Sequence, residues 1–230
     1  MISVVTLTYR RHHLLQEAIH SFLVQDIDVD TEMIVINDAP DVTYSIDDDR
    51  VKIINSPDRF TSIGKKLEYG LKQAKYDYVY RLDDDDLLTP WGLGLVASYI
   101  NEADPHDVYR CPRHYFYCNN KFECLGGSVN NGNCYSREYI DRITFPDVSV
   151  IEDSEITFGN NASIYTGNKD YYSMIYRWGM ATSHISGIGN YDSQVVFDTV
   201  DSICKETGYI HLRPHFNDDY YSQLINVLNK

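Results

Sequence analysis

The sequence is short of basic residues. Its 230 residues include 20 Lys and Arg against 34 Asp and Glu, which gives a net charge of −14. Nucleic acids and anionic membrane surfaces both bind proteins through basic patches. We therefore expect neither of them as a main partner.

Long apolar runs are also missing, since no stretch approaches the roughly 20 residues that span a bilayer. The chain starts directly with the apolar residues 2–7, without a basic segment or a cleavage site before them. That start predicts no signal peptide. Together these absences predict a soluble, cytoplasmic protein with no integral membrane segment.

The five cysteines form no Cys-x-x-Cys pair, which argues against a zinc site built from them. In a reducing compartment we expect free thiols, mostly buried. The Gly-x-Gly-x-x-Gly phosphate loop is absent too, which argues against NAD or FAD as a cofactor.

What the chain does contain is an alternation of strand and helix patterns. Helical spacing of apolar residues predicts helices over 14–23 and 63–74. Near-continuous apolar runs predict buried strands at 2–7, 33–36, 51–54 and 78–82. Strands that alternate with helices favour a Rossmann-like α/β fold, with a mostly parallel central sheet and helices on both faces.

The pattern changes near residues 104–105. Alternating residues at 108–111 and 114–117 predict small antiparallel elements, with Asn119-Asn120 as a hairpin turn. No Ser/Gly-rich linker separates the two parts. We therefore predict a single domain over 1–230 with two halves, 1–104 and 105–230.

Four carboxylates, at positions 83–86, follow the strand at 78–82 directly. Thr89 and Pro90 behind them predict a helix cap with proline at the first helical position. Ligands of open α/β sheets bind just outside the carboxyl ends of the strands. A divalent metal that holds a phosphate is the most economical positive partner for four acids there. The alternative is a solvated acidic turn, which is how we interpret residues 47–49.

Other polar residues follow the neighbouring strands. Thr8 and Tyr9 follow the first strand and Asp38 the second, so all three are expected at the same sheet edge, in a nucleotide pocket. A carboxylate such as Asp38 can accept a hydrogen bond from a base N–H. Its alternative role is that of a turn residue before Pro40.

An acid pair, Glu152 and Asp153, opens a predicted helix in the second half. A helix N-terminus stabilises carboxylates, and a catalytic base must be ionised and partly desolvated. Asp153 is therefore a candidate base, with a capping role for the pair as the alternative. His184, in a later polar loop, is either structural or a ligand.

Taken in this order and spacing, four segments resemble those of family-2 glycosyltransferases with the GT-A fold: 3–9, 32–38, 82–86 and 152–153. The resemblance implies an inverting transfer of one sugar from a UDP-, GDP- or dTDP-sugar to a glycan or other hydroxyl acceptor, in glycan or polysaccharide biosynthesis. It implies Mn²⁺ or Mg²⁺ as the cofactor. Residues 1–104 would bind the nucleotide-sugar, and residues 105–230 would bind the acceptor and supply the base.

The resemblance also implies roles for single residues. Residues that match Thr8, Tyr9 and Asp38 hold the base, and the neighbouring Arg10 joins this group. Three further roles follow: Asp83, Asp84 and Glu152 contact the substrate, Asp85 and Asp83 bind the metal with help from His184, and Asp153 deprotonates the acceptor.

The chain departs from the family pattern in the second helix. Many relatives carry Ala-Arg-Asn before its glycine, whereas here Lys66-Leu67-Glu68 precede Tyr69-Gly70. We expect Lys65 or Lys66 to replace the missing arginine. The Gln-x-x-Arg-Trp segment of processive synthases is also missing, which favours a single addition.

Two other functions use similar residues. A nucleotidyltransferase on a related fold would release pyrophosphate, but it usually carries a glycine-rich loop where this chain has residues 8–11. A non-catalytic nucleotide- or carbohydrate-binding module would be expected to have a damaged acid motif, and both motifs here are intact.

Overall fold

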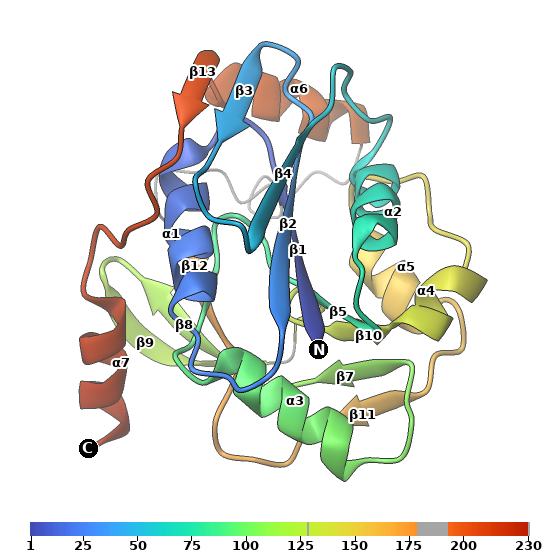
Figure 1. The fold of residues 1–230 in the computed structure, drawn as a ribbon, viewed down its shortest axis with the longest axis vertical. Helices are drawn as coiled ribbons and strands as arrows, with labels where there is room; N and C mark the ends of the chain where they lie inside the picture. The colour runs from blue at the N-terminus through green and yellow to red at the C-terminus, as the bar shows by residue number, and fades with distance from the viewer. Residues whose placement is uncertain (128, 179–192, 230) are drawn as a thin grey trace.

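The computed structural model describes residues 1–127, 129–178 and 193–229. Its central sheet has the strand order β11-β7-β10-β5-β1-β2-β4 (Figure 1). The four predicted strands are neighbours in it and run parallel: β1 (Ile2–Thr8), β2 (Thr31–Asn37), β4 (Val51–Asn55) and β5 (Tyr78–Arg81). Beyond β5 lie β10 (Cys134–Ser136), which is antiparallel to both neighbours, β7 (Val108–Arg110) and β11 (Ile164–Thr166). The predicted mostly parallel sheet is confirmed.

The helices of the described residues are α1 (His12–Leu23), α2 (Ile63–Gln73), α3 (Gly92–Glu102), α4 (Arg137–Arg142), α5 (Glu152–Phe158), α6 (Ser193–Ile203) and α7 (Tyr220–Leu228). Figure 1 shows α1 and α2 on opposite sides of the central strands. Within these described residues, none of the helices combines the length and the apolar character that crossing a membrane requires.

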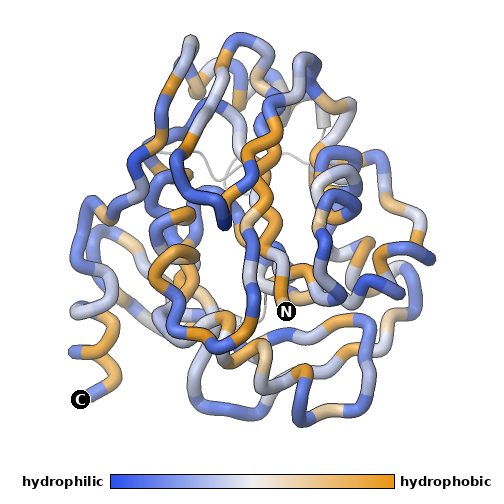
Figure 2. Tube along the Cα trace, viewed as in Figure 1, coloured by the Kyte–Doolittle hydropathy of each residue, from blue (hydrophilic) through white to orange (hydrophobic). Residues whose placement is uncertain are grey.

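The core consists of two layers, one on each face of the central sheet. Successive residues of a strand point to opposite faces. Val4 of β1 therefore packs in one cluster with Leu15 of α1, and Val5 packs in the other with Leu67 of α2. Apolar residues are concentrated along β1 and β2 in Figure 2. Both faces of these strands are buried, as their continuous apolar runs predicted.

A second, four-stranded sheet stands beside the first, in the order β6-β12-β8-β9. Asn119 and Asn120 join β8 and β9 with φ angles of 50° and 60°, as a two-residue hairpin turn requires. This confirms the predicted hairpin. The strands of this sheet are β6 (Leu87–Leu88), β8 (His114–Cys118), β9 (Lys121–Gly126) and β12 (Met174–Trp178). A third pair joins β3 (Val42–Ser45) to β13 (Gly208–His211).

The helix cap predicted at Thr89 is wrong, because α3 begins only at Gly92. The backbone N–H of Thr89 donates to the carbonyl of Ser173, and its hydroxyl donates to the carbonyl of Tyr172. These partners, just before β12, hold Thr89 in an extended segment. They are more than 80 residues away in the chain, so local capping rules do not include them.

The cysteines match the expectation of free, buried thiols wherever their side chains are described. Those side chains are Cys111, Cys118, Cys134 and Cys204.

Candidate active site

A cavity of about 520 Å³ lies at the edge of the central sheet where β1, β2 and β5 end. The carboxyl ends of these parallel strands meet there, as the sequence predicted. Most of the predicted site residues line this cavity: Thr8, Tyr9, Asp38, Lys66, Asp83, Asp85, Glu152 and Asp153.

Two predicted residues are placed differently, and a third lies outside the described residues. Arg10 turns to Asp41, with 2.6 Å between guanidinium nitrogen and carboxylate oxygen, and is not among the described residues that line the cavity. Asp84 is fully buried behind the cavity wall. His184 falls in 179–192, outside the described residues.

A buried ion pair joins Lys66 to Asp38 on one side of the cavity. The Lys66 ammonium donates to Asp38 and also to the carbonyl of Thr8, at 2.6 Å. Burial lowers the pKa of Lys66, although the carboxylate of Asp38 acts in the opposite direction. Lys65, the other candidate, is more exposed and pairs with Glu68 at 2.9 Å. Of the two lysines, only Lys66 lines the cavity, so its role in place of the missing arginine stays a prediction.

Tyr9 connects this side of the cavity to α6. Its hydroxyl donates to Asp201 at 2.5 Å, and the guanidinium of Arg59 lies 4.3 Å from the centre of its ring. Arg59 also bonds Asp201, at 2.7 Å. We had not predicted Arg59 or Asp201, because nothing in their local sequence connects them to Tyr9.

The acid run has an internal positive partner, Arg11. Its guanidinium makes two hydrogen bonds to Asp84 and lies 3.1 Å from Asp85. The sequence had suggested a metal as the partner of these acids, and Arg11 neutralises part of their charge. Burial still outweighs Arg11 and raises the pKa of Asp84 to about 6.

The turn that carries the acids is fixed from two sides. Asn131 accepts a hydrogen bond from the backbone N–H of Asp83 and donates to Asp86. The backbone N–H of Arg177, in β12, donates to Asp86 at 2.8 Å. Burial raises the pKa of Asp86 well above its usual range. Asp86 therefore anchors the turn, while Asp83 and Asp85 face the cavity.

The same run can hold a metal ion. One carboxylate oxygen each from Asp83, Asp85 and Asp86 lie within 4.8 Å of one another. Oxygen ligands of this kind suit hard cations such as Mg²⁺ and Mn²⁺. The donor set therefore fits the predicted cofactor.

Arg81, the last residue of β5, joins the acid run to the later acid pair. Its buried guanidinium lies 3.1 Å from Asp83 and 3.4 Å from Glu152, and it forms an ion pair with Asp153. Burial raises the pKa of Glu152, although Arg81 acts against it. In the sequence, Arg81 is simply part of a buried strand, so we had not predicted this role.

The acid pair opens α5 as predicted, but the residue before it has an unusual backbone. Ile151 has φ 62° and ψ 5°, in the left-handed region. A β-branched residue is strained there. The sharp turn directs Glu152 and Asp153 into the cavity, which both residues line.

We expect Ile151→Asn to raise the free energy of unfolding by about 1 kcal/mol, because asparagine tolerates the left-handed conformation. Ile151 is 56% exposed, so little apolar burial is lost. Urea unfolding measures the change. The same substitution at Ile225, which is 45% exposed within α7, should not stabilise the protein. An equal or lower stability of Ile151→Asn would contradict the inferred strain.

A family model for glycosyl transferase family 2 matches residues 3–149. The chain belongs to this family. The resemblance drawn from the four segments is confirmed. The match includes the acid run and ends just before Glu152 and Asp153, so the role of Asp153 stays a prediction.

One relative is a glucosyltransferase. Over 117 residues, 48% of this chain, the sequence is 34% identical to the GalNAc(5)-diNAcBac-PP-undecaprenol beta-1,3-glucosyltransferase of Campylobacter jejuni. The aligned part is 38% of that protein, so the chain spans well under half of its relative.

Solved structures share the fold. S. aureus TarS in complex with UDP-GlcNAc superposes with a TM-score of 0.66 and 20% identity, over 88% of this chain and 65% of that one. The mannosyltransferase PcManGT of Pyrobaculum calidifontis, in complex with GDP-Man and Mn²⁺, superposes with a TM-score of 0.55 and 15% identity. This match covers 86% of this chain and 67% of that one. These likenesses confirm the predicted GT-A fold.

Proposed function

We propose that this chain transfers one sugar from a nucleotide-sugar to an acceptor hydroxyl, with inversion at the anomeric carbon, in glycan biosynthesis in the cytoplasm. One observation carries the proposal. A single cavity joins the Asp38–Lys66 pair, the carboxylates of Asp83 and Asp85, and the carboxylate of Asp153. Family membership supports glycosyl transfer as the reaction.

The donor nucleotide would bind along the ends of β1 and β2. Asp38 and the backbone around Thr8 can accept hydrogen bonds from a base, while Lys66 keeps Asp38 in place. Tyr9 lines the same side of the cavity, and the guanidinium of Arg59 lies over its ring. UDP-GlcNAc and GDP-Man are the donors in the TarS and PcManGT complexes. A UDP-, GDP- or dTDP-sugar is accordingly the class we propose.

Asp83 and Asp85 would hold Mg²⁺ or Mn²⁺ near the diphosphate. When bound, such an ion neutralises the charge that develops on the leaving nucleoside diphosphate. Arg11, 3.1 Å from Asp85, places a permanent positive charge beside the same carboxylate. It thereby limits the repulsion within the acid run when no substrate is present.

Asp153 would take the proton of the acceptor hydroxyl as that oxygen attacks the sugar. Its carboxylate lies on the cavity wall formed by α5, with the guanidinium of Arg81 between it and Asp83. Attack from the face opposite the leaving group inverts the anomeric carbon. Arg81 would orient Asp153, because its guanidinium forms ion pairs with both Asp83 and Asp153 and fixes the position of one relative to the other.

A thermal-shift screen with UDP, GDP, dTDP, CDP and ADP, each with and without Mn²⁺, tests donor binding. A ligand present at 100 times its Kd should raise the midpoint by roughly 5–10 °C. Release of a nucleoside diphosphate from the matching sugar donor then supports sugar transfer. Release of pyrophosphate from a nucleoside triphosphate that reacts with a sugar phosphate would instead identify a nucleotidyltransferase. No shift with any nucleotide would favour a module with another ligand.

We expect Asp85→Ala to abolish the Mn²⁺-dependent part of this thermal shift, because the variant loses a carboxylate ligand of the ion. Asp49→Ala removes an exposed carboxylate from the other acidic run and should retain the full shift. If nucleotide binding by Asp85→Ala responds to Mn²⁺ as the unmodified protein does, Asp85 does not bind the metal.

A further inference from the structure

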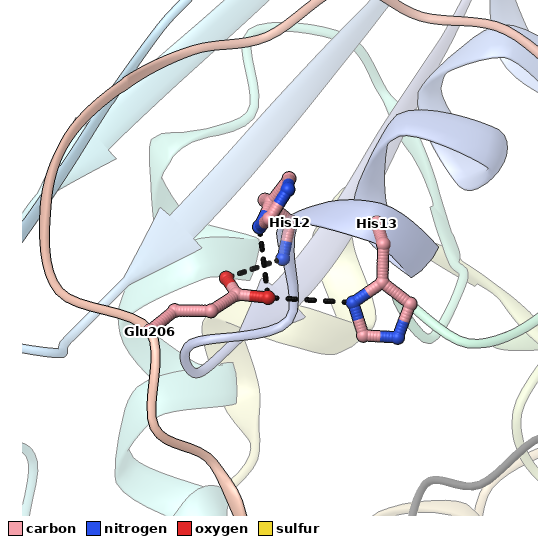
Figure 3. Close-up of side chains that lie close together, drawn as sticks. All are labelled: His12, His13 and Glu206. Atoms are coloured by element: carbon pink, nitrogen blue, oxygen red, sulfur yellow. Dashed lines mark hydrogen bonds and ion pairs between the residues drawn. The ribbon is translucent and has the colours of Figure 1, made fainter.

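A second group of potential metal ligands lies outside the cavity, where α1 begins. The group consists of His12, His13 and Glu206 (Figure 3). The two histidines are the first residues of α1, and Glu206 belongs to the segment between α6 and β13. One ligand atom from each of the three residues lies within 4.8 Å of the others.

Both imidazole rings face the same carboxylate oxygen. Nδ1 of His12 lies 2.8 Å from Oε1 of Glu206, and Nδ1 of His13 lies 3.3 Å from the same atom. Zinc bonds nitrogen and oxygen at about 2.0–2.2 Å, so two ligands of a tetrahedral ion lie roughly 3.3 Å apart. The separation at His13 equals this value, and the separation at His12 is shorter. The ligand nitrogens of the two histidines lie within 4.8 Å of each other.

The carboxylate of Glu206 is held in this orientation by other groups. Its second oxygen, Oε2, accepts hydrogen bonds from the backbone N–H of His12 at 2.8 Å and from the hydroxyl of Tyr44 at 3.2 Å. These bonds turn Oε1 toward the two rings. Partners of this kind around a ligating carboxylate are typical of protein metal sites.

The helix dipole accounts for only part of this arrangement. The N-terminus of α1 attracts an anion, which explains why a glutamate lies there. It does not explain why two imidazoles converge on the same oxygen. Two imidazoles and one carboxylate are a known zinc ligand set, and the half-exposed side chain of His13 leaves room for a water as fourth ligand.

We propose that His12, His13 and Glu206 bind a zinc ion that links the start of α1 to the segment after α6. The site is separate from the Asp83–Asp85 cluster and differs from it in chemistry, because nitrogen ligands favour zinc over magnesium. Its place in the fold gives it a consequence for the cavity. Asp201 of α6 bonds Tyr9 and Arg59, so an ion at Glu206 would fix the helix that contacts the nucleotide side.

Calorimetric titration of the metal-stripped protein with Zn²⁺, in excess Mg²⁺ that occupies the acid cluster, tests the proposal. We expect one zinc per chain in the unmodified protein and in Asp85→Ala. His13→Gln and Glu206→Gln should each weaken binding by about 100-fold or more, since even an indirect partner of a ligand contributes 10–100-fold. His215→Gln, a change at an exposed histidine of another loop, should bind zinc normally.

Two outcomes would overturn the proposal. One is an unmodified protein that binds no zinc, which would leave two ordinary histidine–glutamate ion pairs. The other is zinc binding that disappears in Asp85→Ala and persists in His13→Gln, which would place the ion in the acid cluster. X-ray absorption at the zinc edge provides an independent measurement, because two imidazole ligands have a recognisable signature.

Hydrogen exchange tests the structural consequence without any assay of sugar transfer. Zinc should slow amide exchange over residues 199–206 in the unmodified protein and leave it unchanged in His13→Gln. Exchange that is equally slow with and without zinc would show that the ion does not link these segments. Neither measurement depends on the donor or the acceptor, so the zinc site and the proposed reaction can fail separately.

Discussion

Asp153→Asn should lower the rate of sugar transfer by about 10²–10⁴-fold, the usual contribution of a positioned general base. Asparagine has nearly the same shape but cannot accept the proton of the acceptor hydroxyl. The nucleotide side of the cavity lies at the ends of β1 and β2, whereas Asp153 belongs to α5. Nucleotide affinity should therefore be unchanged. Initial rates at saturating donor, together with the thermal shift by the nucleotide, measure the two quantities.

The matched control is Glu155→Gln, which removes an exposed carboxylate from the same helical turn. Its transfer rate should stay close to that of the unmodified protein. If Asp153→Asn also keeps its full rate, Asp153 is not the base. The neighbouring Glu152 would then be the next carboxylate to test, since it lines the same cavity.

Arg81→Met should lower the free energy of unfolding by about 3–5 kcal/mol, the usual result of removing one partner from a buried ion pair. Arg81 is 4% exposed and contacts Asp83, Glu152 and Asp153. Methionine fills much of the same volume but leaves three carboxylates without their common partner. Chemical unfolding gives the change, and the transfer rate should fall as well because Asp153 loses its orientation.

Arg142→Met is the control for this substitution. Arg142 pairs with Asp107 at 2.6 Å, but its side chain is 46% exposed. Exposed pairs contribute about 1 kcal/mol or less, so this variant should unfold almost like the unmodified protein. A similarly small loss in Arg81→Met would mean that water or a rearrangement of the carboxylates replaces Arg81. Its role as the link between the two acid groups would then be excluded.

The strands and the polar residues behind them could be predicted because their signals are local. A continuous apolar run such as 2–7 identifies a strand buried on both faces, and parallel topology places the ends of such strands together. Asp38 and Asp83 could therefore be assigned to one sheet edge without knowing any contact between them. Family membership, carried by the same segments, could be predicted for the same reason.

The partners of the acids could not be predicted in this way. Arg11 and Asp84 are 73 residues apart in the chain, and Arg81 and Glu152 are 71 apart. The residues next to Arg11 and Arg81 in the sequence contain no pattern that predicts these ion pairs. The prediction of a metal as the main positive partner therefore missed the charge that the protein itself provides.

The sequence by itself determined where the four parallel strands lie along the chain, which edge of the sheet carries the acids, and the family. These properties follow from residue periodicity and from short motifs, each of which lies within a few neighbouring residues. Only the tertiary structure decided which charges neutralise one another: Arg11 with Asp84, Arg81 with Asp153, and Lys66 rather than Lys65 with Asp38. The strength of an ionic contact depends on distance and burial, and both are fixed only when distant segments pack together.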